Sequence, residues 1–130
     1  MKKPELIVTV IKENAGYSAI AKNGQDFIGT QGNTYGELKT NILQAINLAF
    51  EDQAIVYSIE ELSFSLDLQS FFDFYKVINA KALSERIGMN QSLLAQYITG
   101  KKKPSPTQTQ RILNGVQQIG RELAEISFLI

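Results

Sequence analysis

Residues Asn79 to Ser105 read NAKALSERIGMNQSLLAQYITGKKKPS, and this stretch decides the fold of the C-terminal half. Leu83 and Ile87 lie four residues apart, on one face of a first helix, and Gly88 ends that helix. Asn90 then offers a side-chain oxygen that can cap a second helix. The spacing therefore predicts two short helices joined by a tight turn.

The second of these helices is predicted to have an apolar face and a polar face. The apolar face consists of Leu94, Tyr97 and Ile98. The small and polar face consists of Gln91, Ser92, Ala95, Gln96 and Thr99. In the major groove Gln and Asn can pair bidentately with adenine, and Ser can pair with donors or acceptors. We therefore expect Gln91, Ser92 and Gln96, with Asn90 beside them, to bind DNA bases.

Three consecutive lysines follow the second helix. Lys101, Lys102 and Lys103 come directly after Gly100, so the chain turns and presents three ammonium groups beside the predicted reading helix. Ammonium groups in such a position suit DNA phosphates, and we place Lys81 in the same DNA-binding set. The alternative is that two amphipathic helices and a solvated lysine loop have this pattern without binding DNA.

The run from Leu83 to Ser105, LSERIGMNQSLLAQYITGKKKPS, resembles the DNA-binding domain of phage-repressor-like (Xre-type) regulators. The resemblance includes the glycine at the turn, the apolar Leu94 and the G-x-x-x-P-S ending. It departs at Ser84, where that family usually has Ala at the contact between helices. The resemblance implies a helix-turn-helix that binds operator DNA.

The composition sets limits on the class of protein. The 130 residues are 44% hydrophobic and 20% charged, which is typical of one soluble domain or of two small ones. The sequence has no Cys, which excludes disulfides and thiolate metal sites, and no His, the commonest general base and metal ligand. We expect no metal and no cofactor. No run approaches about 18 apolar residues and no signal peptide is evident, so we expect a cytoplasmic protein.

The charges are unevenly distributed although their sum is zero. Residues 76–111 contain seven Lys and Arg and one Glu, a net charge of +6. Residues 1–66 contain five Lys and eight Asp and Glu, a net charge of −3. The basic part can attract DNA, and the acidic part suits a basic protein or solvent.

The N-terminal half predicts three antiparallel strands. Residues 5–12, 17–22 and 26–30 are rich in β-branched and apolar side chains, and turn sequences containing Asn and Gly separate them. We expect Phe27 to be the core anchor of the third strand. Thr34 and Glu37 form a capping box at the start of a helix that runs to about Glu51.

The apolar stripe of this helix could be buried by a small sheet, and it consists of Leu38, Ile42, Ala45, Ile46, Ala49 and Phe50. Residues 53–60 are expected to form another strand, and residues 62–68 alternate between apolar and polar as a half-buried strand does. The expected fold class is α+β, with a β-β-β-α-β domain at residues 1–66, its sheet covered on one face, followed by an all-α domain at residues 67–130.

The segments GYSAIA at 16–21 and FIGTQGNT at 27–34, followed by a helix with Glu37 in its first turn, resemble the N-terminal domain of the HicB antitoxin family. That resemblance implies a partial ribonuclease-H-like fold that binds and inhibits a small HicA-type mRNA-cleaving toxin. The toxin-binding candidates are Tyr17, Phe27, Thr30 and Gln31. Tyr17 and Phe27 are equally well explained as core residues.

Two other functions remain open from the residues alone. A two-metal nuclease needs several converging carboxylates, but the middle of the first strand is apolar and Glu5 and Glu13 lie at its ends, so we expect no enzyme. The other alternative is a stand-alone transcriptional regulator whose N-terminal domain senses a small ligand.

The remaining C-terminal residues predict packing and association. An aromatic helix at 68–78 is expected to wall the core of the second domain, with Asp67 at its cap. A last helix is expected from Thr107, with a possible break at Gly115 or Gly120. The apolar residues 126–130 should be buried in their own domain or in an interface. We expect a homodimer or a higher homo-oligomer through the C-terminal domain.

Overall fold

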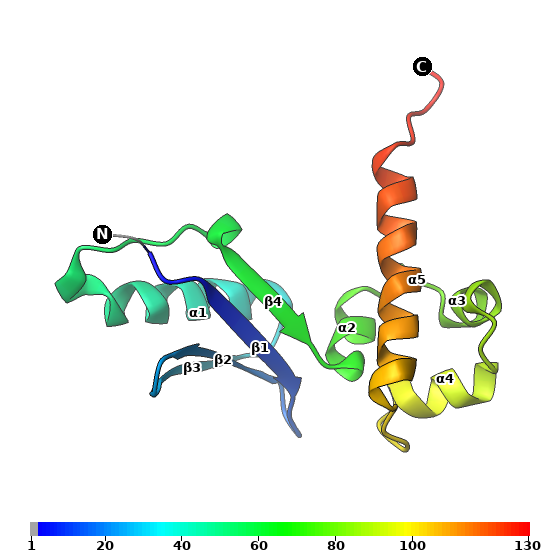
Figure 1. Cartoon of the computed structure of the whole chain (residues 1–130), viewed down its shortest axis with the longest axis horizontal. Coiled ribbons are helices and arrows are strands. Elements are labelled where there is room, and N and C mark those ends of the chain that lie inside the picture. Colours follow the sequence, from blue (N-terminus) through cyan, green and yellow to red (C-terminus); the bar gives the residue numbers. More distant parts are fainter. Residues whose placement is uncertain (1–2) are drawn as a thin grey trace. The chain divides into compact units, whose positions relative to one another are not determined.

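A computed structural model describes residues 3–130 of the chain. Over this range the protein is of the α+β class, with one four-stranded mixed sheet and five α-helices (Figure 1). It divides into two compact units, Met1–Phe74 and Tyr75–Ile130, which we name the sheet unit and the helical unit. The division expected between residues 66 and 67 falls just before α2 (Leu68–Phe74), which lies within the sheet unit.

The sheet confirms the expected three-stranded antiparallel meander, and the strand expected at residues 62–68 is also present, over residues 62–66. Its strands are β1 (Leu6–Lys12), β2 (Tyr17–Asn23), β3 (Asp26–Gly32) and β4 (Leu62–Leu66), in the order β3-β2-β1-β4. β1 pairs with β2, and β2 with β3, in antiparallel register, whereas β4 runs parallel to β1. A parallel neighbour needs a crossover connection, and the helix α1 (Tyr35–Ala49) lies in that connection.

The core of the sheet unit lies between α1 and one face of the sheet. Thr34 caps α1 as predicted, and its hydroxyl oxygen accepts a hydrogen bond from the Glu37 N–H at 3.1 Å. The buried side chains of the predicted helical stripe are Leu38, Ile42, Ile46 and Phe50, whereas Ala45 is half-buried and Ala49 is exposed. Alternate strand residues meet this stripe, including Val8, Val10, Ala19 and Ala21. Each large apolar side chain buried here contributes about 1.5–3 kcal/mol.

The prediction of a strand at residues 53–60 was wrong. Two short 3-10 helices, Glu51–Gln53 and Ile59–Glu61, overlap the two ends of this segment, and the stretch between them is irregular. The Asn47 side chain of α1 accepts from the Tyr57 N–H at 2.7 Å and donates to the Tyr57 carbonyl at 3.1 Å. These two bonds occupy the backbone groups that strand pairing would use, so the segment is held against α1 instead.

The aromatic helix also differs from expectation, because it ends at Phe74 and its last ring packs in the sheet unit. Asp67 caps it, since its carboxylate accepts from the Ser70 N–H at 2.9 Å. The Phe74 ring stacks on Tyr35 and lies tilted against Tyr17, with centroids 4.5 Å apart in both pairs. Phe74 therefore packs against the core of the sheet unit, and the expectation that it walls the core of the second domain was wrong.

The helical unit contains α3 (Ala80–Ile87), α4 (Gln91–Ile98) and α5 (Pro106–Ala124). The possible break in the last helix is absent from residues 106–124, which form one continuous helix. Gly115 serves packing instead: a Cβ there would lie 2.4 Å from Ile87 Cγ2, so the glycine allows α3 and α5 to approach closely. Residues 126–130 are exposed, so they are not buried within their own chain. Among residues 3–130, no helix is both long and apolar enough to cross a membrane.

Candidate nucleic-acid interface

Local side-chain bonds define the two short helices of the helical unit. The Asn79 side chain accepts from the Ala82 N–H at 3.0 Å at the start of α3, and Gly88 ends that helix with a φ of 68°. Asn90 caps α4 as predicted, accepting from the Leu93 N–H at 3.1 Å. Gly88 takes the left-handed conformation at a helix C-terminus because it has no Cβ to clash. The chain therefore turns from α3 to α4 within three residues.

The two faces of α4 are separated as the sequence predicts. Leu94 and Tyr97 are buried, and Ile98 is half-buried. The opposite face is exposed along its whole length, and it consists of Gln91, Ser92, Ala95, Gln96 and Thr99. The apolar face fixes α4 on the unit, so the amide and hydroxyl groups of the other face are presented to solvent on a rigid helix.

Asn90 has a structural role at its side-chain oxygen. That oxygen accepts the capping bond, which orients the side chain at the start of α4, and the amide nitrogen can still donate to a partner. Ser84 is buried, and its hydroxyl donates to the Lys81 carbonyl at 2.6 Å. The hydroxyl is thus satisfied, so Ser is accommodated at this position.

All four predicted phosphate-binding lysines are exposed. Lys101, Lys102 and Lys103 follow Gly100, whose φ of 80° turns the chain after α4. The Lys102 N–H donates to the Gln96 carbonyl at 3.2 Å, which holds the lysine segment at the C-terminal end of the helix. Lys81 lies on α3. The Gly100 turn therefore places cations next to the polar face of α4.

Two arginines of the basic stretch are engaged inside the helical unit. The Arg111 guanidinium donates to the carbonyls of Ile87 at 2.9 Å and Gly88 at 2.6 Å, which are the last residue of α3 and the residue that caps it. Arg86 forms an ion pair with Glu122, which joins α3 to α5. Sequence reasoning counted both arginines only as charge. Arg111 instead satisfies carbonyl groups at the turn that precedes α4.

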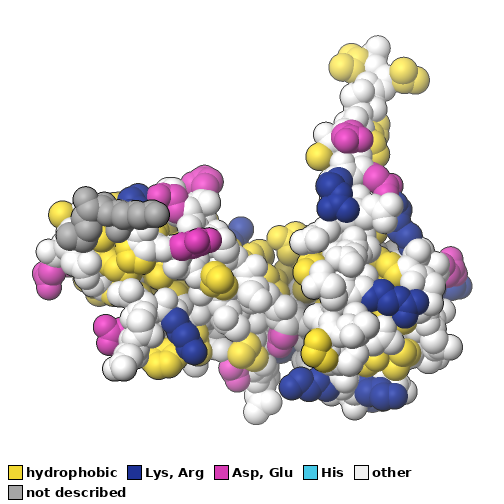
Figure 2. All heavy atoms as spheres, in the orientation of Figure 1, with side chains coloured by type: hydrophobic (Ala, Val, Ile, Leu, Met, Phe, Trp, Pro, Cys, Tyr) yellow, Lys and Arg dark blue, Asp and Glu magenta, His cyan; other side chains and the backbone are white. Residues whose placement is uncertain are grey.

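The net charges of the two units have opposite signs. The helical unit contains eight Lys and Arg and three Asp and Glu, a net charge of +5, and the sheet unit has a net charge of −5. Figure 2 shows the dark-blue cationic side chains mainly over the helical unit and the magenta carboxylates mainly over the sheet unit. An anionic ligand is therefore attracted to the helical unit.

The predicted toxin-binding residues lie on both faces of the sheet. Phe27 is 65% exposed, so the expectation that it anchors the core was wrong. The two-residue turn at Gly24 and Gln25 pairs Asn23 with Asp26, and this register turns Ile28 instead of Phe27 toward α1.

Gln31 shares the open face of the sheet with Phe27, since the two residues are four apart in β3, whereas Thr30 alternates to the covered face. Phe27 borders a hollow of about 550 Å³ that Glu5, Ile7, Thr9, Ile20 and Lys22 also line. Ile7 and Ile20 were missed by sequence reasoning, because a continuous apolar run does not show which face of a strand is open.

Tyr17 has structural partners. Its hydroxyl donates to the Asp73 carboxylate at 2.9 Å, and its ring packs on Phe74. Burial raises the pKa of Tyr17, and the neighbouring Asp73 raises it further, so the phenol stays protonated as a donor. Tyr17 therefore belongs to the packing of α2 against the sheet.

Comparison of the chain with protein-family models, with curated proteins and with solved structures gives no match.

Proposed function

We propose that the chain is a HicB-type antitoxin that represses its own operon. In this proposal α3 and α4 form an Xre-like helix-turn-helix that binds operator DNA, and the sheet unit is a partial ribonuclease-H-like domain that binds and inhibits a HicA-type toxin. The observation that carries the proposal is the exposed polar face of α4, fixed by its buried apolar face and adjoined by three exposed lysines.

The DNA-binding part rests on complementary chemistry. Gln91 and Ser92 are in the first turn of α4, where a helix entering the major groove contacts base edges. The lysines after Gly100 can neutralise phosphates near the C-terminal end of the same helix. Two copies would present two such helices, which suits the pseudo-palindromic sites of helix-turn-helix dimers.

The toxin-binding part rests on the open face of the sheet. Phe27, Ile7 and Ile20 are large apolar side chains that are exposed in a unit whose net charge is −5. Exposed apolar side chains on a rigid sheet are suited to a protein interface, and the negative charge favours a basic partner such as a ribonuclease. Enzymatic activity is not part of the proposal.

The DNA-binding part is tested with Gln91→Ala. Removing a bidentate base contact should weaken binding to the chain's own promoter region by about 1–3 kcal/mol and leave binding to unrelated DNA unchanged. Gln117→Ala is the matched control, because Gln117 is exposed on α5. Binding is measured by fluorescence anisotropy at fixed salt. If both variants bind like the wild type, α4 does not read the sequence.

The toxin-binding part is tested by co-expressing the chain with the product of the neighbouring gene. We expect a stable complex that Phe27→Ser disrupts. Leu48→Ser is the matched control, since Leu48 is similarly exposed, at 71%, but lies on α1 in the same unit. Absence of a complex, together with a small molecule that changes DNA affinity, would favour the ligand-sensing regulator instead.

A further inference from the structure

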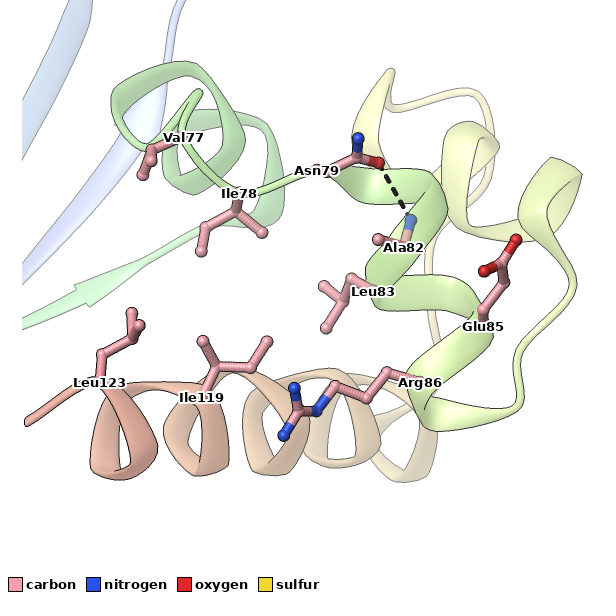
Figure 3. A pocket seen from close by; sticks show the side chains of 9 residues that line it. All are labelled: Val77, Ile78, Asn79, Ala82, Leu83, Glu85, Arg86, Ile119 and Leu123. Atoms are coloured by element: carbon pink, nitrogen blue, oxygen red, sulfur yellow. Dashed lines mark hydrogen bonds between the residues drawn. The ribbon is translucent and has the colours of Figure 1, made fainter. Parts of the chain in front are cut away.

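The helical unit contains an apolar groove of about 680 Å³ between α3 and α5. Figure 3 shows the side chains of Val77, Ile78, Leu83, Ile119 and Leu123 directed into it from the start of the unit and from both helices. Leu83 is buried at its floor, whereas Val77 is 86% and Leu123 60% exposed at its rim. Large apolar side chains are thus left in contact with water at a concave surface.

One end of this groove is polar. Arg86 and Glu85 lie there on α3, and Arg86 is paired with Glu122 of α5. Val77, Ile78 and Leu123 border the opposite end, which is apolar. A ligand that fills the groove should therefore be apolar itself and should enter from the end near Leu123.

A segment with that chemistry follows α5. Residues 126–130 read ISFLI, and Phe128 is 87% exposed. The N–H groups of Glu125 and Ile126 donate to the Glu122 and Leu123 carbonyls, which closes the last turn of the helix, and residues 126–130 have no regular secondary structure. Residues 125–130 extend beyond the end of α5, away from α3 (Figure 1). They leave their own groove unfilled.

We propose that the groove receives residues 126–130 of a second copy of this chain, and that the exchange is reciprocal. When each of two copies places its segment in the groove of the other, the two contacts are identical and are related by a two-fold axis. To reach its own groove the segment would have to reverse direction over Glu125 to Ser127 and break the bond from the Ile126 N–H to Leu123, whereas a partner's segment requires no such change. The dimer itself does not depend on the proposed function, and only its binding to a palindromic operator does.

Because the sequence contains no Cys, disulfide trapping tests the exchange without background. Val77→Cys and Leu129→Cys are purified separately, mixed without DNA and oxidised mildly. We expect a covalent dimer from the mixture and little from either variant alone. Gln117→Cys mixed with Leu129→Cys is the control, since Gln117 is exposed but does not line the groove, and should give little product. Equal trapping in both mixtures would overturn the proposal.

The variant that carries both Val77→Cys and Leu129→Cys separates the two possible sources of the segment. A segment from a second copy gives a covalent dimer, whereas a chain that folds back on itself gives an internally linked monomer. The second result would overturn the proposal. Strong trapping by Leu129→Cys alone would also overturn it, because the two segments would then pair with each other.

Light scattering provides a measurement that does not depend on cysteine. The wild type should be a dimer at micromolar concentration, and Phe128→Ser should shift it toward monomer by at least about tenfold in dissociation constant. Leu113→Ser is the control, since Leu113 is an exposed residue of α5 outside the groove. Circular dichroism verifies that both variants are folded. A monomeric wild type, or equal effects of both substitutions, contradicts the exchange. Loss of DNA binding with trapping intact would count against the proposed function alone.

Discussion

In the sheet unit the most distinctive exposed surface is apolar and the net charge is negative, whereas in the helical unit the exposed face of α4 is polar and the net charge is positive. The cores differ in a related way. The sheet unit is held together by strands that pair although they are far apart in the sequence, as β1 and β4 are. The helical unit is held together by the close approach of α3 and α5 at Gly115. A net charge of zero can therefore be the sum of two oppositely charged units whose surfaces suit different classes of partner.

The largest effect is expected from removing the cations beside α4. Replacing Lys101, Lys102 and Lys103 by Gln should weaken binding to all DNA sequences. With three fewer phosphate contacts, the fall in affinity between about 50 and 200 mM salt should shrink by on the order of 40-fold. The complex proposed for the sheet unit should be unaffected. An unchanged salt dependence would show that these lysines do not contact phosphates.

The second-largest effect distinguishes the stability of the helical unit from that of the sheet unit. Gly115→Ala forces a Cβ against Ile87 and should destabilise the helical unit by about 1–3 kcal/mol. Gly120 has no neighbouring atom within 4 Å of the same position, so Gly120→Ala should stabilise α5 by up to about 1 kcal/mol. Hydrogen exchange of each unit provides the measurement. Equal changes in both units would show that they unfold together.

The matching change in the sheet unit is Asn47→Ala. It removes both hydrogen bonds to the Tyr57 backbone and should cost about 1–3 kcal/mol, because those backbone groups lose their partners. Protection should fall in the sheet unit and not in the helical unit. Asn41→Ala is a milder control, since Asn41 donates one bond to the Gln31 carbonyl at an exposed position. Equal losses from the two variants would contradict this role of Asn47.

The smallest effect concerns the ion pair between Lys3 and Glu61 at 2.8 Å. The Lys3 ammonium holds the pKa of Glu61 below its usual range. A lowered folded pKa stabilises the protein above the unfolded pKa, and this contribution is lost as the pH falls through the folded pKa. Glu61→Gln should therefore reduce the stability of the sheet unit slightly at about pH 7 and not at about pH 2. Both side chains are exposed, so a large effect would be unexpected.

The sequence predicted best those features that depend on neighbours within a few residues. The caps at Thr34 and Asn90, the turn at Gly88 and the two faces of α4 each depend on one or two turns of chain. Their physical causes, a side-chain acceptor or a missing Cβ, act locally. The polar face proposed to bind DNA was therefore identifiable from residues 79–105 alone.

The features that sequence reasoning missed depend on distant contacts. Phe27 is exposed because strand register, set by a turn, decides which alternate side chains face α1. Residues 53–60 avoid the sheet because Asn47, on another element, bonds to Tyr57. The aromatic helix ends in the sheet unit because Phe74 fits between Tyr17 and Tyr35. None of these partners is adjacent in sequence, so periodicity could not identify them.

Arg111 has one further consequence, for how charge is counted. Its guanidinium donates to the Ile87 and Gly88 carbonyls at the turn before α4. In the proposed DNA complex, the number of counterions released should therefore be smaller than the number of cationic residues in the basic stretch. Replacing Arg111 should change the angle at which α4 meets a groove, and so alter which sequence is preferred more than how steeply affinity depends on salt.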